Sequence, residues 1–180
     1  MIYAVSDTHI NHTNALKYTG RERFHSVEEM NAEIVKRWNE VVDNNDTVYH
    51  LGDVFLSHSQ EAKELLRGLK GYKILIRGNH DDKSDQWYYN AGFNEVHRRL
   101  DLISPTHPAQ FGYILTHIPV PYWEIESLEQ ETGRKIVNLH GHLHLVTDRT
   151  FTGDDVWEHP SSYENFSLEA RNFCPTPIYL

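Results

Sequence analysis

Short apolar runs alternate with amphipathic stretches along the first half of the chain. The runs Ile2–Ser6, Thr47–Leu51 and Lys73–Arg77 have the length of buried strands, and each stops at a polar cluster. Amphipathic stretches separate them, so strand and helix alternate. This order predicts a parallel sheet covered by helices.

Apolar side chains recur at spacings of three and four over residues 27–42, which predicts a helix with one apolar face. Ser26, with Glu29 three residues later, forms a capping box at its start. Glu61–Leu69 and Asp85–Ala91 have the pattern of two shorter helices, closed by glycines.

The second half of the chain is rich in strand patterns. One weak helix signal lies near Glu124–Glu131, and we interpret Thr147–Ser162 as a long loop beside the site. The expected strands are Glu95–Ile103, Tyr113–Thr116, Lys135–Leu139 and Tyr163–Leu168. We therefore expect α/β architecture with a second sheet packed on the first. No linker or repeat divides the chain, which predicts a single domain over residues 1–180.

Composition narrows the classes of function. The chain has 17 Lys and Arg against 26 Asp and Glu, a net charge of −9, so no duplex nucleic acid is expected as partner. The single cysteine, Cys174, excludes an intrachain disulfide and a multi-cysteine zinc site. No signal peptide and no long apolar run are visible, so we expect a cytoplasmic protein without membrane contact.

Side chains that can bind metal follow five of the predicted strands. The carboxyl ends of parallel strands meet at one edge of a sheet, so these clusters are expected to converge. If the chain stays extended, Asp7 and His9 point the same way, as do His142 and His144. The clusters are Asp7-Thr8-His9, Gly52-Asp53, Gly78-Asn79-His80-Asp81, Thr116-His117 and Gly141-His142-Leu143-His144. Such nitrogen and oxygen donors without thiolate suit Mn, Fe, Co, Ni or Zn.

Each block has an ordinary structural explanation when taken alone. Gly-Asp is a common turn, and His-x-His is often exposed to solvent. Their joint occurrence, in order and at strand ends, is what indicates a metal site.

In this pattern the sequence resembles the calcineurin-like metallophosphoesterase superfamily, and most closely its short, uncapped prokaryotic and phage type. All the family's blocks stand in order between residues 7 and 144. The resemblance implies two packed mixed sheets flanked by helices, an αββα sandwich. It also implies two divalent metal ions, with manganese favoured.

The resemblance also implies a role for each block. Asp53 would bridge the two ions, His80 would act as the general acid, and Asp81 would orient it. Arg21 and Arg23 precede the first helix and could clamp a phosphate, although a solvated arginine is the simpler interpretation. The first metal would be held by Asp7, His9 and His144, and the second by Asn79, His117 and His142, with His12 and Arg23 as candidate substrate contacts.

We therefore expect a metal-dependent hydrolase that cleaves a phosphodiester or phosphomonoester by attack of a metal-bridging hydroxide. The diester is favoured, and the substrate is a small phosphate ester or nucleotide. One alternative is a catalytically idle scaffold with the same fold. A dinuclear amidohydrolase is a weaker alternative, because that class needs a longer chain and an early His-x-His.

Overall fold

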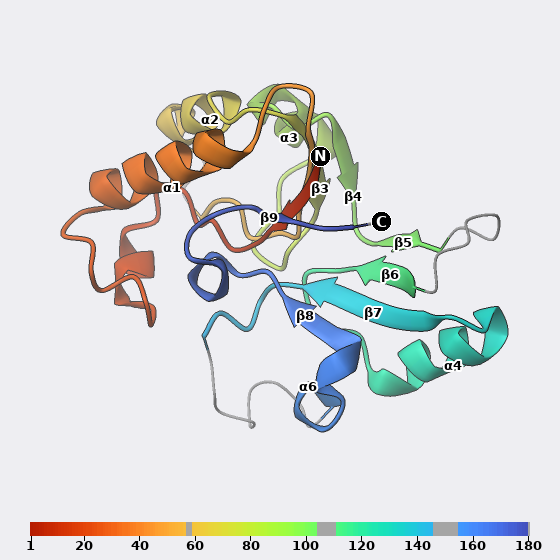
Figure 1. Ribbon diagram of the computed structural model, residues 1–180. Helices are drawn as coiled ribbons and strands as arrows, with labels where there is room; N and C mark the ends of the chain where they lie inside the picture. The colour runs from red at the N-terminus through yellow and green to blue at the C-terminus, as the bar shows by residue number, and fades with distance from the viewer. Residues whose placement is uncertain (57–58, 104–110, 146–154, 180) are drawn as a thin grey trace.

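Two β-sheets pack face to face in the computed structural model, which describes residues 1–56, 59–103, 111–145 and 155–179 (Figure 1). The first sheet has the order β4-β3-β2-β1-β9, and all its strands are parallel except β9. Its strands are β1 (Ile2–Val5), β2 (Thr47–His50), β3 (Tyr72–Ile76), β4 (Glu95–His97) and β9 (Thr176–Pro177).

The second sheet has the order β5-β6-β7-β8, in which β5 alone runs antiparallel to its neighbour. Its strands are β5 (Leu100–Leu102), β6 (Phe111–Leu115), β7 (Lys135–His140) and β8 (Tyr163–Asn165). Both sheets are therefore mixed, as the family resemblance implies, whereas the alternation of strand and helix predicted a parallel first sheet.

Helices cover the outer face of each sheet (Figure 1). The first sheet is covered by α1 (Val27–Val41), α2 (Gln60–Arg67) and α3 (Asp85–Ala91), and the second by α4 (Tyr122–Thr132). Shorter elements are α6 (Asp155–Glu158) and the 3-10 turns η1 (Thr13–Lys17), η2 (Pro160–Ser162) and η3 (Leu168–Arg171). The layers run helix, sheet, sheet, helix, which confirms the predicted αββα sandwich. None of the helices described is long and apolar enough to cross a membrane.

Three apolar clusters hold these layers together. Trp38 of α1, fully buried, lies in the cluster under the first helical layer. Leu51 and Ile76 face Leu115 and Leu139 between the sheets, and Ile125 of α4 packs on the second sheet. Each interface removes apolar surface from water, which is the main favourable contribution to folding.

The predicted capping box at Ser26 is present in modified form. Ser26 Oγ accepts a hydrogen bond from Glu29 N at 3.1 Å. The Glu29 carboxylate accepts from His25 N at 2.7 Å, one residue earlier than the usual reciprocal bond. One free amide of the first turn of α1, that of Glu29, is thereby satisfied, and the helix begins where the sequence predicts.

Three predictions for the second half were wrong in part. Residues 95–103 do not form one strand, because β4 joins the first sheet and β5 the second, with the break at Arg98 and Arg99. Within the predicted loop, residues 155–162 contain α6 and η2, while residues 147–154 lie outside the described part of the chain. The last predicted strand ends at Asn165, and η3 follows.

Candidate metal centre

The loops after β1, β2, β3, β6 and β7 meet at one edge of the two packed sheets. Backbone bonds join them: Asp7 N donates to Gly52 O at 2.9 Å, and Gly141 N donates to His117 O at 2.9 Å. His142 N donates to the Asp7 carboxylate at 3.0 Å, which links the two sheets directly. The convergence of strand ends thus brings residues from 7 to 144 into one cluster.

The backbone at these positions is not extended, so the condition under which alternate side chains would point the same way is not met. Asp7 and His9 have φ of 57° and 46°, and His142 and His144 have φ of 67° and 47°. Asp53 is also left-handed, with φ of 56°. Such conformations cost about 1–3 kcal/mol each and concentrate at functional sites, where the surrounding structure holds them in place.

Gly141, the glycine before His142, is explained more by the close approach of the loop after β1 than by a turn of its own backbone. A β-carbon on Gly141 would lie 2.6 Å from the Ser6 Cβ, inside van der Waals contact. At Gly52 a β-carbon would lie 2.5 Å from Gly78 N, and φ there is 94°. Gly141 lets the loop after β7 touch the loop after β1, and Gly52 lets the loop after β2 touch the loop after β3, so that the side chains around them can share one space.

One half of the cluster is built around Asp7. His144 Nε2 lies 3.5 Å from Asp7 Oδ1, and His9 Nε2 lies 3.9 Å from the same oxygen. The two imidazoles stack, with their Nε2 atoms 3.3 Å apart. Asp7 and His9 are buried, and His144 is 20% exposed. These three side chains could bind one metal ion.

The other half is built around Asp53 and His117. His117 Nε2 lies 3.3 Å from Asp53 Oδ2 and 3.0 Å from Asn79 Oδ1. Asp7, Asp53 and His117 form a second group that could bind a metal ion, so Asp7 belongs to both groups. The two candidate metal positions are therefore next to each other.

The protonation pattern of this cluster fits a bound cation. His117 Nδ1 must donate its proton to Leu51 O at 2.7 Å, which directs Nε2 toward the oxygens of Asp53 and Asn79. Burial opposes protonation of the ring, yet Asp53 and Asp7 raise the His117 pKa to about 9. His9 Nδ1 is buried without a hydrogen-bond partner. A positive charge is thus favoured where these atoms converge, and imidazole with carboxylate suits divalent transition metals.

The structure places His142 and Asn79 at the edge of this arrangement. The His142 ring meets the His117 ring edge to face at 5.2 Å between centroids. Asn79 is exposed but reaches His117 through its amide oxygen. Asn79 thus places a neutral oxygen beside the second group, whereas His142 lies next to His117 but belongs to neither group of described residues that could bind a metal ion.

His80 and Asp81 occupy different positions, although they are neighbours in sequence. His80 is about half exposed, its amide donates to Asp53 Oδ1 at 3.0 Å, and its Nε2 lies 3.9 Å from Asp53 Oδ2. Asp81 is buried and accepts hydrogen bonds from the amides of Gly78, Asp53 and Val54. Burial raises the Asp81 pKa to about 6. The Asp81 carboxylate holds the backbone of two loops, whereas we expected it to orient the His80 ring.

Sequence reasoning missed three residues that support the cluster. Glu169 Oε1 accepts from His144 Nδ1 at 3.2 Å, and the same carboxylate binds Arg21. Ser167 Oγ donates to Asp7 Oδ2 at 2.9 Å, and the Tyr18 ring lies 5.0 Å from the His144 ring. No local motif marks these positions, because they lie outside the metal-binding blocks, in or next to short 3-10 turns.

Arg21 is fully buried, so it is neither a solvated arginine nor a free phosphate clamp. Its guanidinium donates to the carbonyls of Asp7 and Thr8 and to Glu169. It therefore holds the strained backbone of the first block. Its burial follows from the length of its side chain, which reaches the cluster from the loop before α1.

The two substrate candidates differ in position. The His12 ring lies 5.9 Å from the His9 ring and 6.2 Å from Tyr18, so His12 is at the rim of the cluster. The Arg23 guanidinium lies over the rings of Phe24 and Phe173. Among the described residues no contact joins Arg23 to the cluster, so the structure does not bring it to the site.

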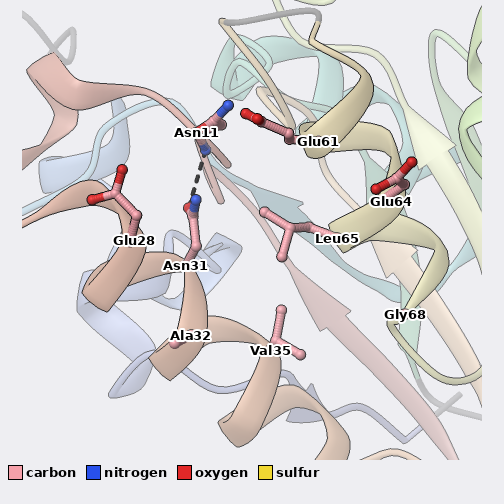
Figure 2. Close-up of a pocket in the computed structure, with 9 residues that line it drawn as sticks. All are labelled: Asn11, Glu28, Asn31, Ala32, Val35, Glu61, Glu64, Leu65 and Gly68. Atoms are coloured by element: carbon pink, nitrogen blue, oxygen red, sulfur yellow. Dashed lines mark hydrogen bonds between the residues drawn. The ribbon is translucent and has the colours of Figure 1, made fainter.

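Two cavities differ in their relation to the cluster. One of about 270 Å³ has the candidate ligands Asn79 and His117 in its wall. A roomier one, of about 560 Å³, lies between α1 and α2 and is drawn in Figure 2. Its lining includes Glu28, Glu61 and Glu64, which would repel a phosphate. The smaller cavity is therefore the better candidate to bind a phosphate ester.

Comparison with known proteins agrees with this geometry. The family model described as calcineurin-like phosphoesterase matches residues 1–173. An uncharacterized protein of Methanocaldococcus jannaschii is 52% identical over 82 residues, which cover 44% of this chain and 46% of that protein. The gene 66 protein of Mycobacterium phage L5 is 37% identical over 79 residues, 42% of this chain and 37% of that protein. The matched stretches thus span less than half the length of either relative.

A solved structure of a protein of unknown function from Aquifex aeolicus is similar over the whole fold. The TM-score is 0.72 at 23% identity, covering 98% of this chain and 94% of that one. At this identity the likeness supports the fold alone.

Proposed function

Because the chain belongs to the calcineurin-like phosphoesterase family, we propose that it hydrolyses phosphate esters at two divalent cations held by this cluster. The observation that carries the proposal is the paired arrangement of His117 and His144. Each uses Nδ1 on a backbone or carboxylate oxygen and directs Nε2 at a carboxylate of the cluster. This is how ligating histidines are usually oriented.

We assign one cation to Asp7, His9 and His144, and the other to Asn79, His117 and His142, with Asp53 between them. Manganese is favoured by the family resemblance, and the nitrogen and oxygen donors also suit Fe, Co, Ni or Zn. Once bound, two such ions polarise phosphoryl oxygens and make a water molecule nucleophilic near neutral pH.

The remaining chemistry falls to side chains of this protein. Hydrolysis breaks the bond between phosphorus and the leaving oxygen, which must gain a proton unless it departs as a stable anion. His80 is fixed to Asp53 through its amide, while its ring is about half exposed at the rim. It can therefore reach a bound ester and deliver a proton from Nε2.

The diester is the favoured substrate, because the site is open. Asn79 and His80 are both exposed, so in the described part of the chain no residue covers the side on which a second ester group would lie. A catalytically idle scaffold is the competing function, and metal-dependent turnover separates the two.

The test uses the metal-stripped protein with and without Mn²⁺, on bis(4-nitrophenyl) phosphate and 4-nitrophenyl phosphate. We expect turnover only with metal, and faster turnover of the diester. Asp7→Asn removes a carboxylate shared by both metal groups and should abolish turnover. Asp43→Asn is the matched control, since the Asp43 side chain is 89% exposed. If two metals bind and neither ester is hydrolysed with any metal, the scaffold explanation holds instead.

A further inference from the structure

The cavity beside the cluster lies where the ends of three strands meet. Its wall combines the loop after β3, the break between β4 and β5, and the loop after β6. The lining residues are Arg77, Gly78, Asn79, Arg98, Thr116, His117 and Ile118. At about 270 Å³ it is smaller than a typical small-molecule site, so it suits one group of a larger substrate. Asn79 and His117 place that group next to the reacting phosphate.

The two arginines of this wall have different roles. Arg77 donates to Asp81 O, to Lys83 O and to Asp85, and its guanidinium lies over the Tyr88 ring. These contacts stabilise the loop after β3 and occupy the Arg77 guanidinium. Arg98 is exposed, and no hydrogen bond or ion pair joins it to any residue in the described part of the chain.

The lack of a described hydrogen-bond or ion-pair partner sets Arg98 apart from the arginine next to it. Arg99, one residue later, is bound by the carboxylates of Asp101 and Glu124. In a chain of net charge −9 an acidic partner is the common outcome for a cation, yet among the described residues that line this cavity there is no Asp or Glu. The cavity between α1 and α2 has the opposite character, because its described lining residues include three glutamates and no Lys or Arg (Figure 2).

We propose that this cavity is a subsite for a second phosphate of the substrate, bound by Arg98. This inference rests on the proposed function and names its substrate class: a phosphate ester that carries another phosphate a few bonds away, such as a nucleotide phosphorylated at two positions. The planar guanidinium can bind two phosphate oxygens at once. Ile118, 51% exposed at the same cavity, offers an apolar contact for the sugar between the phosphates.

The test compares two substrates that differ only in the second phosphate. They are thymidine 5′-(4-nitrophenyl phosphate) with and without a 3′-phosphate. Arg98→Ala should raise the KM for the 3′-phosphorylated substrate about 10- to 100-fold with little change in kcat. The KM for the other substrate should change less than about twofold, and Arg98→Lys should recover part of the loss. Lys36→Ala, which removes an equal charge from a side chain 66% exposed on α1, should change neither KM.

A binding measurement tests the phosphate subsite independently of catalytic activity. Thymidine 3′,5′-bisphosphate is titrated into the Mn²⁺-loaded protein and into Arg98→Ala, and the variant should bind about 10- to 100-fold more weakly. If the wild type hydrolyses neither substrate but this difference holds, the subsite stands and the proposed function fails. If Arg98→Ala affects both substrates equally, or neither, the subsite is overturned while the phosphoesterase activity stands.

Discussion

Glu169 Oε1 lies 3.2 Å from Nδ1 of His144, and the same carboxylate binds the buried guanidinium of Arg21. Burial works against the charged carboxylate, but His144 and Arg21 hold the Glu169 pKa below its ordinary value. Glu169 therefore stays negative, fixes the His144 proton on Nδ1 and leaves Nε2 free for a metal. A residue near the carboxyl end of the chain thus supports a ligand after β7 and the backbone after β1.

Glu169→Gln should weaken binding of the metal assigned to Asp7, His9 and His144 by about 10- to 100-fold, with less effect on the second metal. The amide cannot balance the charge of Arg21, and it holds the His144 ring less firmly. Isothermal titration of the metal-free protein with Mn²⁺ would resolve the two sites. Glu164→Gln is the matched control, because Glu164 is 44% exposed and pairs only with Arg171 among the described residues. Unchanged affinity at both sites would contradict the supporting role.

Asp53→Asn should lower the affinity for both metals if this carboxylate bridges them. The structure includes Asp7 in both candidate groups and Asp53 in one, so Asp7→Asn belongs in the same experiment. Metal content per chain after dialysis is the measurement, with Asp43→Asn as control. We expect less than one metal per chain in Asp53→Asn. Loss of one metal in Asp53→Asn and of both in Asp7→Asn would assign the bridge to Asp7.

Much of the fold follows from local patterns in the sequence. The apolar runs before Asp7, Asp53 and Asn79 form three neighbouring parallel strands, and Ser26 begins α1 as predicted. Strand periodicity could not show that residues 95–103 change sheets. No glycine or proline lies in that stretch, and only tertiary packing separates β4 from β5.

The metal-binding blocks could be recognised in the sequence because they follow predicted strands. The residues that hold these blocks in place could not. Arg21, Ser167 and Glu169 act through contacts with residues more than a dozen positions away. The left-handed backbone at Asp7 and His142 was also missed. A bond such as that from His142 N to the Asp7 carboxylate forms only after the two sheets have packed.

His80→Ala should lower kcat on a diester with an alkyl leaving group by about 10²- to 10⁴-fold, because the alkoxide needs a proton as it departs. The loss should be far smaller with a nitrophenol leaving group, since nitrophenolate is stable as an anion. The ratio of the two rates is measured in the wild type and the variant. His25→Ala, at an exposed position before α1, should match the wild type on both esters. An equal loss on both esters would assign His80 to binding.

His50, a buried residue beside the cluster that is not itself a proposed metal ligand, should make folding stability depend on pH. The ring is fully buried: Nδ1 accepts from Gly52 N at 3.2 Å, and Nε2 contacts Thr8 Oγ1 at 2.9 Å. Burial lowers the His50 pKa to about 3, so between its ordinary pKa near 6.5 and 3 the unfolded chain takes up a proton that the folded chain does not. The free energy of unfolding should therefore fall as the pH drops through this window, by at most about 1.4 kcal/mol per pH unit from this group. His50→Asn keeps an acceptor for Gly52 N without titrating, and urea unfolding from pH 7 to 4 should show a shallower pH dependence than in the wild type or in the exposed control His25→Asn. Identical slopes in all three proteins would show that the cost of protonating His50 does not govern acid stability.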